Sequence, residues 1–425
     1  MTAYSGSNSP DAPALLLIDS GDRLYRGYAL KALAARYRVI LIGAAAPIWQ
    51  QPHLTDHRVV DPADLEALRG AAQELAALHR IGGVLSWNEF AVVHAAVIAE
   101  SLGVPGLDPA SVRACRSKSA ARAVFDAHKV PSARWVPVDT FAQARMAAEH
   151  LGYPFVLKPA SAAGSAGVIR VDGPDQLQSA YAFTAGAAAR HGVESAGLLA
   201  EEYLAGPEVS VEVVSVPGHH HVAAVTHKQL SQPPYFEELG HIVAPALRSP
   251  ATDAAENVAV QALEALDITH GVAHVEIRLT PAGPRIVEIN PRLGGDLIPH
   301  LVHLATGIDL VAAAADLAMG LLPNLRPTRA EAAAVGFVYP ATAGHLRTLT
   351  ADPSLLARPW CERAVLEQQP DALVAPPPAS GLDSRLAHLI VTAETPALCR
   401  RRMDRALSAV HADITALDTD QAAAA

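Results

Sequence analysis

The sequence is poor in cysteine. Its 425 residues include three cysteines, Cys115, Cys361 and Cys399, which lie far apart. An odd, widely spaced set argues against a disulfide framework and forms no metal-binding pattern. We therefore expect a cytoplasmic protein whose thiols behave as small buried apolar groups.

The sequence also lacks long apolar runs and an excess of positive charge. The N-terminal stretch MTAYSGSNSPDAPALLLID has no basic region of the signal-peptide kind, and its apolar run ALLLI is far too short to cross a bilayer. The formal net charge is −10, which disfavours nonspecific binding to nucleic acid or an anionic membrane. We expect small molecules as partners, with room for a local basic site that binds phosphates.

Two nucleotide-binding fingerprints are missing as well. Apolar strands at 14–19, 38–43 and 81–87 alternate with helices, which predicts a parallel, Rossmann-like sheet. No G-x-G-x-x-G follows the first strand, so a dinucleotide role is disfavoured. The P-loop pattern G-x-x-x-x-G-K-[ST] does not describe the small-residue loop discussed below.

The chain is too long for one hydrophobic core, so several lobes are expected. The strand pattern changes from parallel α/β to antiparallel α+β after about residue 108. We predict an N-terminal domain over 1–108, a small central lobe over 109–200 and a large lobe over 201–425. A C-terminal subdomain is expected from about residue 326, with an exposed loop over 370–384.

A loop without bulky side chains follows the strand that ends at Lys158. The stretch KPASAAGSAGV holds only small residues between Lys158 and Val168. Such a loop brings backbone N–H groups close to an anion, while serine hydroxyls and the lysine add donors and charge. This chemistry suits a polyphosphate; a flexible surface loop is the alternative.

Acidic residues follow in AEEYLAGPEVSVEV. Glu201 and Glu202 end one strand, and Glu208 begins the next after a Gly-Pro turn. The backbone near Leu204 has free groups for an adenine edge, and Glu208 can accept hydrogen bonds from ribose. A solvated acidic hairpin is the competing interpretation.

Two later strands carry carboxylates on one face. In HVEIRLTPAGPRIVEINPR, strand alternation places Glu276 with His274, and Glu288 with Asn290, opposite the aliphatic faces. If the strands pair as a hairpin, both carboxylates face the same way. Two carboxylates and an amide oxygen are ligands suited to Mg²⁺, although cross-strand ion pairs would explain the same pattern.

Taken in order, these motifs resemble the ATP-grasp superfamily of ATP-dependent carboxylate–amine ligases over about residues 14–325. The resemblance implies a two-lobed fold with the nucleotide between the lobes. It implies that Lys118 and Lys158 reach the ATP phosphates. It also makes 160–167 the flexible loop, with Ser161, Ser165 and Gly167 at the phosphates.

The same resemblance assigns the remaining ATP-site residues. Glu201, Glu202 and Leu204 belong to the adenine-binding strand between the lobes, and Glu208 is the ribose carboxylate. The implied metal ligands are Glu276, Glu288 and Asn290, for Mg²⁺ with Mn²⁺ as a substitute. Arg292 matches the arginine that stabilises the transferred phosphoryl group.

Within that superfamily, HKQLSQPPYFEELGHIVAP and INPRLGGDLIPHLVHLATGIDL look most like bacterial L-amino-acid ligases, which make dipeptides. That likeness places Glu238 and His241 in the substrate pocket. Asn88 and Glu89 follow the third parallel strand, where open sheets bind ligands, but they also suit a helix start. Gly295 would admit the substrate, and Asp296 is either a specificity position or a helix cap.

The implied reaction joins the carboxylate of one amino acid to the amine of another through an acyl phosphate. The alternatives are an ATP-grasp carboxylase that activates bicarbonate and a nucleotide-binding protein without catalysis. No biotin-carrier MKM motif occurs, which disfavours the first alternative, and the intact metal set disfavours the second. The sequence leaves the two substrates and the oligomeric state open, with a homodimer as one expectation.

Overall fold

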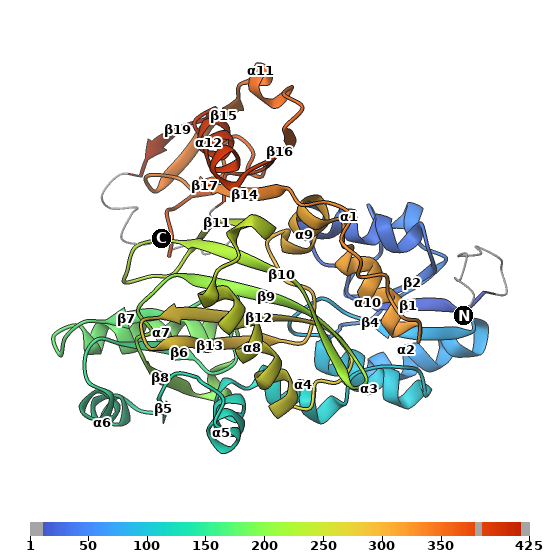
Figure 1. Cartoon of the computed structure of the whole chain (residues 1–425), viewed down its shortest axis with the longest axis horizontal. Helices are drawn as coiled ribbons and strands as arrows, with labels where there is room; N and C mark the ends of the chain where they lie inside the picture. Colours follow the sequence, from blue (N-terminus) through green and yellow to red (C-terminus); the bar gives the residue numbers. More distant parts are fainter. Residues whose placement is uncertain (1–11, 379–384, 418–425) are drawn as a thin grey trace.

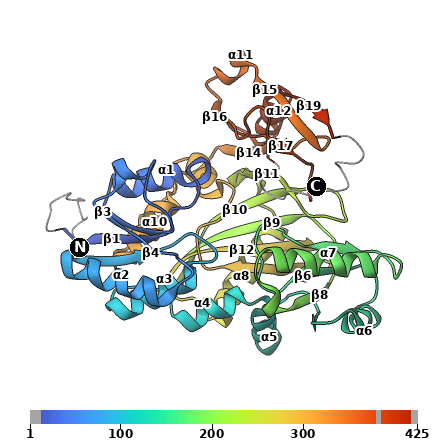
Figure 2. The same cartoon turned by 180° about the vertical axis from the view of Figure 1, so that it is seen from behind.

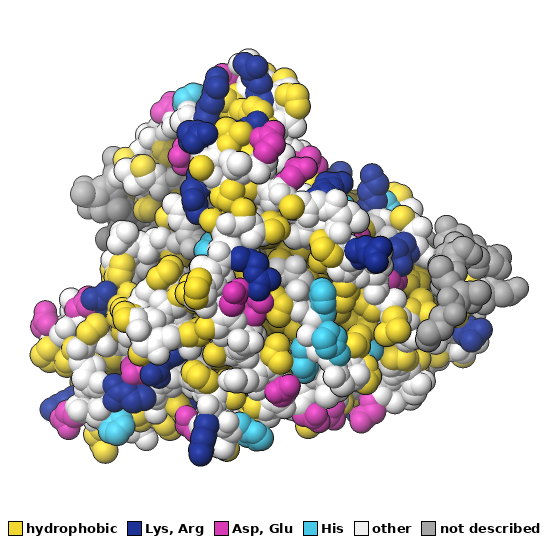
Figure 3. Space-filling view, in the orientation of Figure 1, with side chains coloured by type: hydrophobic (Ala, Val, Ile, Leu, Met, Phe, Trp, Pro, Cys, Tyr) yellow, Lys and Arg dark blue, Asp and Glu magenta, His cyan; other side chains and the backbone are white. Residues whose placement is uncertain are grey.

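A computed structural model describes residues 12–378 and 385–417. In Figures 1 and 2 the N-terminal domain, a small lobe and a C-terminal region surround one large central sheet. The fold is mixed α/β with several layers, as the sequence predicts. On the face in Figure 3, basic and acidic side chains are interspersed.

The N-terminal domain is built on a parallel sheet. Its strands are β1 (Ala14–Ile18), β2 (Arg38–Gly43), β3 (Asp56–Val59) and β4 (Ile81–Leu85), in the order β3-β2-β1-β4. Its helices are α1 (Arg23–Ala34), α2 (Leu65–Leu78) and α3 (Val92–Leu102). β1 is fully buried, which explains its unbroken apolar sequence. The prediction from sequence did not include β3, because this strand is short, polar and partly exposed.

The small lobe carries an antiparallel sheet in the order β5-β8-β6-β7. The strands are β5 (Trp135–Val138), β6 (Phe155–Pro159), β7 (Ile169–Val171) and β8 (Leu198–Glu202), and the helices are α6 (Phe141–Leu151) and α7 (Leu177–Arg190). The two helices and this sheet share one apolar core. α6 begins with a reciprocal capping box between Thr140 and Gln143.

The large sheet has eight strands, paired antiparallel throughout. In sheet order they are β13 (Gly283–Asn290), β12 (Gly271–Thr280), β9 (Glu208–Val216), β10 (His219–Leu230), β11 (Glu238–Val243), β14 (Ala332–Val338), β18 (Ala387–Ala393) and β16 (Cys361–Leu366). β12 and β13 form the expected hairpin. Glu276 pairs with Glu288, and His274 with Asn290, so both carboxylates face the same way, as predicted.

Helices cover this sheet. They are α4 (Pro109–Arg116), α5 (Lys118–His128), α8 (Pro250–Ala265), α9 (Ile298–Thr306) and α10 (Leu310–Ala318). The predicted break between α4 and α5 is present at Ser117, which caps α5. Cys115, Ala121 and Phe125 of this helix pair share a core with β9 and β12. We therefore propose that the small lobe begins after α5.

The C-terminal region adds β14, β18 and β16 to the large sheet and forms a small sheet of its own. The small sheet holds β17 (Leu373–Val374), β15 (Gly344–Ala351) and β19 (Val410–Ala416), with α11 (Pro353–Leu356) and α12 (Pro396–Leu407) nearby. The sequence pattern predicted strand structure over 334–346. In the structure, β14 ends at Val338 in the large sheet and β15 begins at Gly344 in the small sheet. Part of the predicted 370–384 loop forms β17, and 379–384 lie outside the described residues.

Three short 3₁₀ segments complete the described structure, at Gln51–His53, Glu194–Ala196 and Pro245–Leu247. Among the described residues, no helix alone has the length and apolar character needed to cross a membrane; α9 and α10 meet that test only as a pair bent by 108°.

Candidate active site

Two adjoining cavities lie where the small lobe and the N-terminal domain meet the large sheet. The first cavity runs between the small lobe and the β12–β13 hairpin, and the second continues toward the N-terminal domain. The small-residue loop forms part of both walls through Ala163, Gly164 and Ser165, and so do Glu238, Glu276 and Arg292. Because these residues are shared, ligands in the two cavities would approach each other near Arg292.

Both lysines predicted for phosphate binding are buried in the wall of the first cavity. Lys118 Nζ lies 2.8 Å from the Ala162 carbonyl oxygen and 3.0 Å from Glu288 Oε1. Lys158 Nζ lies 2.6 Å from Glu201 Oε2. Burial lowers the pKa of Lys158, and the charge of Glu201 opposes that shift.

The predicted adenine strand lines the same cavity with Glu201, Glu202 and Leu204. Glu201 is buried, but its pKa is lowered, because Arg122 at 3.0 Å and Lys158 outweigh the cost of burial. Its carboxylate therefore acts on the lysine, and the backbone of the strand is what faces a ligand. Glu202 pairs with two surface-facing arginines, Arg134 at 2.8 Å and Arg285 at 3.2 Å.

A buried lysine that sequence reasoning missed sits among the acidic residues. Lys228 Nζ lies 3.1 Å from Glu208, 2.5 Å from Glu238 and 3.1 Å from Glu276. Burial disfavours its charge, but the carboxylates outweigh burial and raise its pKa. Lys228 lies directly opposite Glu208 in the β9–β10 register, a pairing that only the structure reveals.

The predicted metal ligands come together at the β12–β13 hairpin. Glu276 and Glu288 are cross-strand neighbours, and each is paired with a lysine, Lys228 and Lys118 respectively. His274 bridges Glu276 at 3.2 Å and Glu212 at 2.8 Å. Burial disfavours the imidazolium, but Glu212 and Glu276 raise the pKa of His274 to about 10.

Glu89 connects the N-terminal domain to this hairpin. Its buried carboxylate pairs with both Arg116 and Arg292, and these guanidinium groups keep its pKa low despite burial. With its nitrogen turned toward Glu89, the Asn290 amide lies 3.0 and 3.1 Å from the two carboxylate oxygens. In that orientation the Asn290 amide oxygen does not face Glu89 and is available to bind a metal ion.

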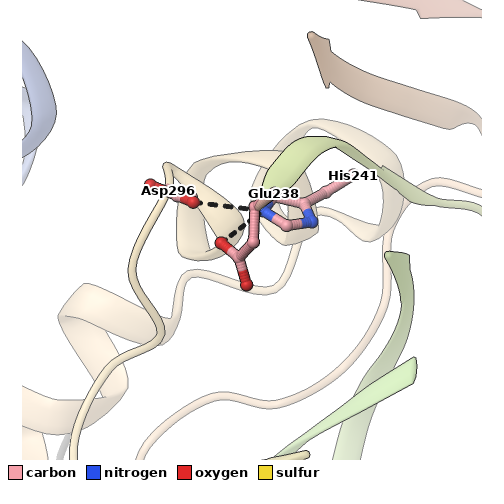
Figure 4. A group of neighbouring side chains, drawn as sticks. All are labelled: Glu238, His241 and Asp296. Carbon is pink, nitrogen blue, oxygen red and sulfur yellow. Dashed lines mark hydrogen bonds and ion pairs between the residues drawn. The ribbon is translucent and has the colours of Figure 1, made fainter. Parts of the chain in front are cut away.

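Glu238, His241 and Asp296 converge beside the second cavity, whose wall includes Glu238 and Asp296 but not His241 (Figure 4). His241 Nε2 lies 3.3 Å from Glu238 and 3.4 Å from Asp296. Three such donors resemble a metal site in their spacing. However, both carboxylates already have cationic partners, since Glu238 pairs with Lys228 and Asp296 pairs with Arg385. We therefore interpret the group as a charge network.

Asp296 is neither a helix cap nor a free acid. The residue before α9 is Leu297, and it makes no side-chain cap bond. Asp296 instead accepts two hydrogen bonds from Arg385, at 2.6 and 2.8 Å. Arg385 also stacks 3.6 Å from the Phe337 ring centroid. The expected attraction of Asp296 for a cationic substrate group is thus already satisfied from within the protein.

Three further predicted residues lie outside both cavity walls. The Asn88 side chain donates to Asp19 at 2.5 Å and accepts from the Phe90 amide at 2.8 Å, so it shapes its own loop. Ser161 Oγ faces the Arg116 carbonyl oxygen, at 3.5 Å. Gly167 ends the loop at a positive φ of 72°, where a Cβ would lie 2.6 Å from Ala187 Cβ. We therefore leave these three out of the proposed ligand contacts.

Comparisons with known proteins agree with this geometry. Residues 151–300 match the family model described as "ATP-grasp domain". This part of the chain is an ATP-grasp domain. Residues 336–415 match a second model, "L-amino acid ligase C-terminal domain 2", which covers the region that supplies Arg385.

Relatives of this chain include a carnosine synthase and an L-amino acid ligase. It is 28% identical over 292 residues to human carnosine synthase 1, covering 65% of this chain and 35% of that protein. It is 22% identical over 318 residues to the L-arginine-specific L-amino acid ligase of Bacillus subtilis, covering 73% and 76% of the two chains. This chain spans about a third of the length of the carnosine synthases.

Among solved structures, the L-amino acid ligase from Bacillus licheniformis superimposes with a TM-score of 0.82 at 22% identity. The match covers 95% of this chain and 99% of that one. At this level of identity, the likeness establishes only that the two proteins share a fold, which includes the N-terminal domain and the C-terminal region.

Proposed function

We propose that this protein is an ATP-dependent ligase that joins the carboxylate of one amino acid, or of a small carboxylic acid, to the amine of another. The supporting observation is the pair of adjoining cavities, one lined by buried lysines and the other by ionic groups, which meet at Arg292. The match of 336–415 to an L-amino acid ligase domain favours this function over carboxylation of a substrate by bicarbonate.

ATP would occupy the first cavity. Lys118 and Lys158 lie in its wall beside the small-residue loop, which suits the phosphates. Leu204 and the strand that precedes it suit the base. Glu208 is already paired with Lys228 and with Arg278, at 3.1 and 2.8 Å, so ribose hydroxyls would join an existing ionic network there.

The hairpin residues Glu276, Glu288 and Asn290 would hold Mg²⁺. Their chemistry fits, since two carboxylates face the cavity side by side with an amide that can turn its oxygen toward it. The lysines now paired with the two carboxylates show that this site favours positive charge. When bound, the metal ion would neutralise charge on the ATP phosphates.

In the reaction that we propose, a carboxylate oxygen attacks the γ-phosphorus of ATP, and ADP leaves with the electrons of the broken P–O bond. The amine of the second substrate then attacks the acyl carbon, phosphate leaves, and the amine nitrogen loses a proton. Arg292 reaches both cavities, so its guanidinium is placed to stabilise charge in both steps.

Replacing Glu288 tests this proposal. We expect Glu288→Gln to lower amino-acid-dependent ADP release at least about a hundredfold, the effect of losing one charge contact of about 3 kcal/mol. Glu362→Gln is the matched control, since Glu362 is an exposed strand residue outside both cavities. Substrates are found beforehand by measuring phosphate release across pairwise mixtures of amino acids.

Hydroxylamine gives a second measurement, because it converts acyl phosphates to hydroxamates. We expect hydroxamate from the wild type with ATP and the correct acid, and none from Glu288→Gln. Near-normal amide synthesis by Glu288→Gln would refute the metal assignment. ADP release that depends on bicarbonate, with no hydroxamate from any acid, would point to the carboxylase instead.

A further inference from the structure

The second cavity receives side chains from three parts of the chain. Arg26 of α1, Trp87 and Glu89 come from the N-terminal domain, Glu237 adjoins β11, and Gly295 follows β13. A Cβ placed on Gly295 would meet no atom within 4 Å, so this glycine leaves open space in the cavity. The cavity is therefore suited to a small ligand beside Arg292.

Most charged groups in this wall are neutralised inside the protein. Glu89 pairs with Arg116 and Arg292, Glu238 and Glu276 pair with Lys228, and Asp296 pairs with Arg385. Within residues 12–378 and 385–417, the charged groups of this wall that make no ion pair are Arg26 and Glu237. One is a cation and the other is an anion.

Arg26 has unused hydrogen-bonding capacity. Its guanidinium lies 5.9 Å from the Trp87 ring centroid, and its buried Nη1 has no hydrogen-bond partner among the described residues. Burial, together with the charge of Arg292, lowers the pKa of Arg26. A buried guanidinium nitrogen without an acceptor is costly, so this position favours a bound anion.

Glu237 is the acidic counterpart. It is 6% exposed, and its side chain makes no hydrogen bond or ion pair within the part of the chain that the structure describes. Its backbone is fixed by Ser231, whose hydroxyl accepts from the Glu237 amide at 3.0 Å and whose amide donates to the Glu237 carbonyl oxygen at 2.8 Å. The carboxylate is thus held in the cavity wall without a direct ion pair, although the charge of Arg385 acts on it.

We infer that Arg26 and Glu237 bind the amine-donor substrate as a zwitterionic amino acid, with its carboxylate at Arg26 and its ammonium group toward Glu237. This inference rests on the proposed function. Arg26 lines the second cavity and not the first, so the carboxylate that it binds is not the one that meets ATP. The product is then a dipeptide or related amide whose carboxylate stays free.

Amino-acid amides test the role of Arg26, because they keep the amine and lack the carboxylate. The probes are the proteinogenic L-amino acids and the corresponding L-amino acid amides, at a saturating concentration of the acyl donor. For the wild type we expect kcat/KM to be about 10- to 100-fold higher for the amino acid than for its amide, the usual effect of a charge-assisted contact.

Arg26→Ala should remove that preference. We expect a rise in KM for the free amino acid, an unchanged kcat/KM for the amide, and partial recovery in Arg26→Lys. Arg23→Ala is the matched control, because Arg23 is exposed on the same helix and lies outside both cavities. Glu237→Gln should raise KM for the amine donor with either probe, since both carry the ammonium group.

Hydroxylamine separates failure of this inference from failure of the proposed function. It needs neither charged group, so Arg26→Ala should form hydroxamate at the wild-type rate, which also shows that the variant is folded. Absence of hydroxamate with the wild type would overturn the proposed function. Three results would overturn the inference alone: a wild type indifferent to the carboxylate, a preference that survives in Arg26→Ala, or a change confined to KM for the acyl donor.

Discussion

An unpaired buried carboxylate should lower stability at neutral pH, and Glu237 provides the test. Burial raises the pKa of Glu237 from 4.5 to about 6; the charge of Arg385 opposes this shift, and Glu238 adds a smaller contribution to it. Between these two pH values the unfolded chain releases the proton while the folded protein retains it. Stability is therefore complete below about pH 4.5 and falls as the pH rises through 6.

The size of this effect follows from the shift in pKa. A shift from 4.5 to about 6 corresponds to about 2 kcal/mol, at 1.36 kcal/mol per pKa unit. Glu237→Gln has no charge to bury at any pH, so its advantage over the wild type should grow by that amount between pH 4 and 7.5. For a cooperative unit of 150–250 residues, this is roughly 4–8 °C in melting temperature.

Differential scanning fluorimetry at a series of pH values measures this difference. Other titrating groups contribute equally to both proteins and cancel when the two are compared at the same pH. Glu331→Gln is the control, since Glu331 is exposed. A difference between Glu237→Gln and the wild type that stays constant from pH 4 to 7.5 would refute the claim that this carboxylate is buried without a partner.

The remaining predictions concern two ion pairs. Arg385→Leu should lower the free energy of unfolding by about 3–5 kcal/mol, because it leaves Asp296 buried without its partner. Addition of Asp296→Asn should restore part of the loss in urea denaturation, and additive effects of the two changes would contradict the pairing. Glu201→Gln should make ATP affinity fall more steeply from pH 7 to 9, because burial then lowers the pKa of Lys158 unopposed. Calorimetric titrations with the same pH dependence as the wild type would contradict this.

Local patterns predicted the parts of the site that lie within one strand or one hairpin. The alternation in residues 273–290 was sufficient to place Glu276 and Glu288 on one face of the hairpin, because the side-chain period of a strand is two. The bulge after Glu276, which sets the two carboxylates directly opposite each other, was not predicted. The buried strands of the N-terminal sheet were equally readable, since a parallel strand covered on both faces is continuously apolar.

Contacts between distant segments were not predictable in this way. Asp296 looked like a free acid because its partner, Arg385, lies 89 residues later in the sequence. Arg26 lies in an ordinary amphipathic helix, and nothing in its local sequence shows that the helix faces Trp87. Ser161 and Gly167 carried the right residue types, but they lie outside both cavity walls, and local sequence does not show which loop residues reach the cavity.

The eight-stranded sheet has a consequence for how such a protein can be divided. The segment that matches the ATP-grasp model contains β11, and the segment that matches the C-terminal model begins at residue 336, inside β14. The two strands are neighbours in one sheet, where Gly240–Val243 pair with Ala333–Gly336. A cut between them would open the hydrogen-bonding edge of β11 and remove Arg385 from Asp296 at the same time. The C-terminal segment therefore cannot be exchanged as an independent unit. A chimera that replaces it must keep a β11 strand that pairs with the new β14 and a residue at position 296 that pairs with the new residue at position 385.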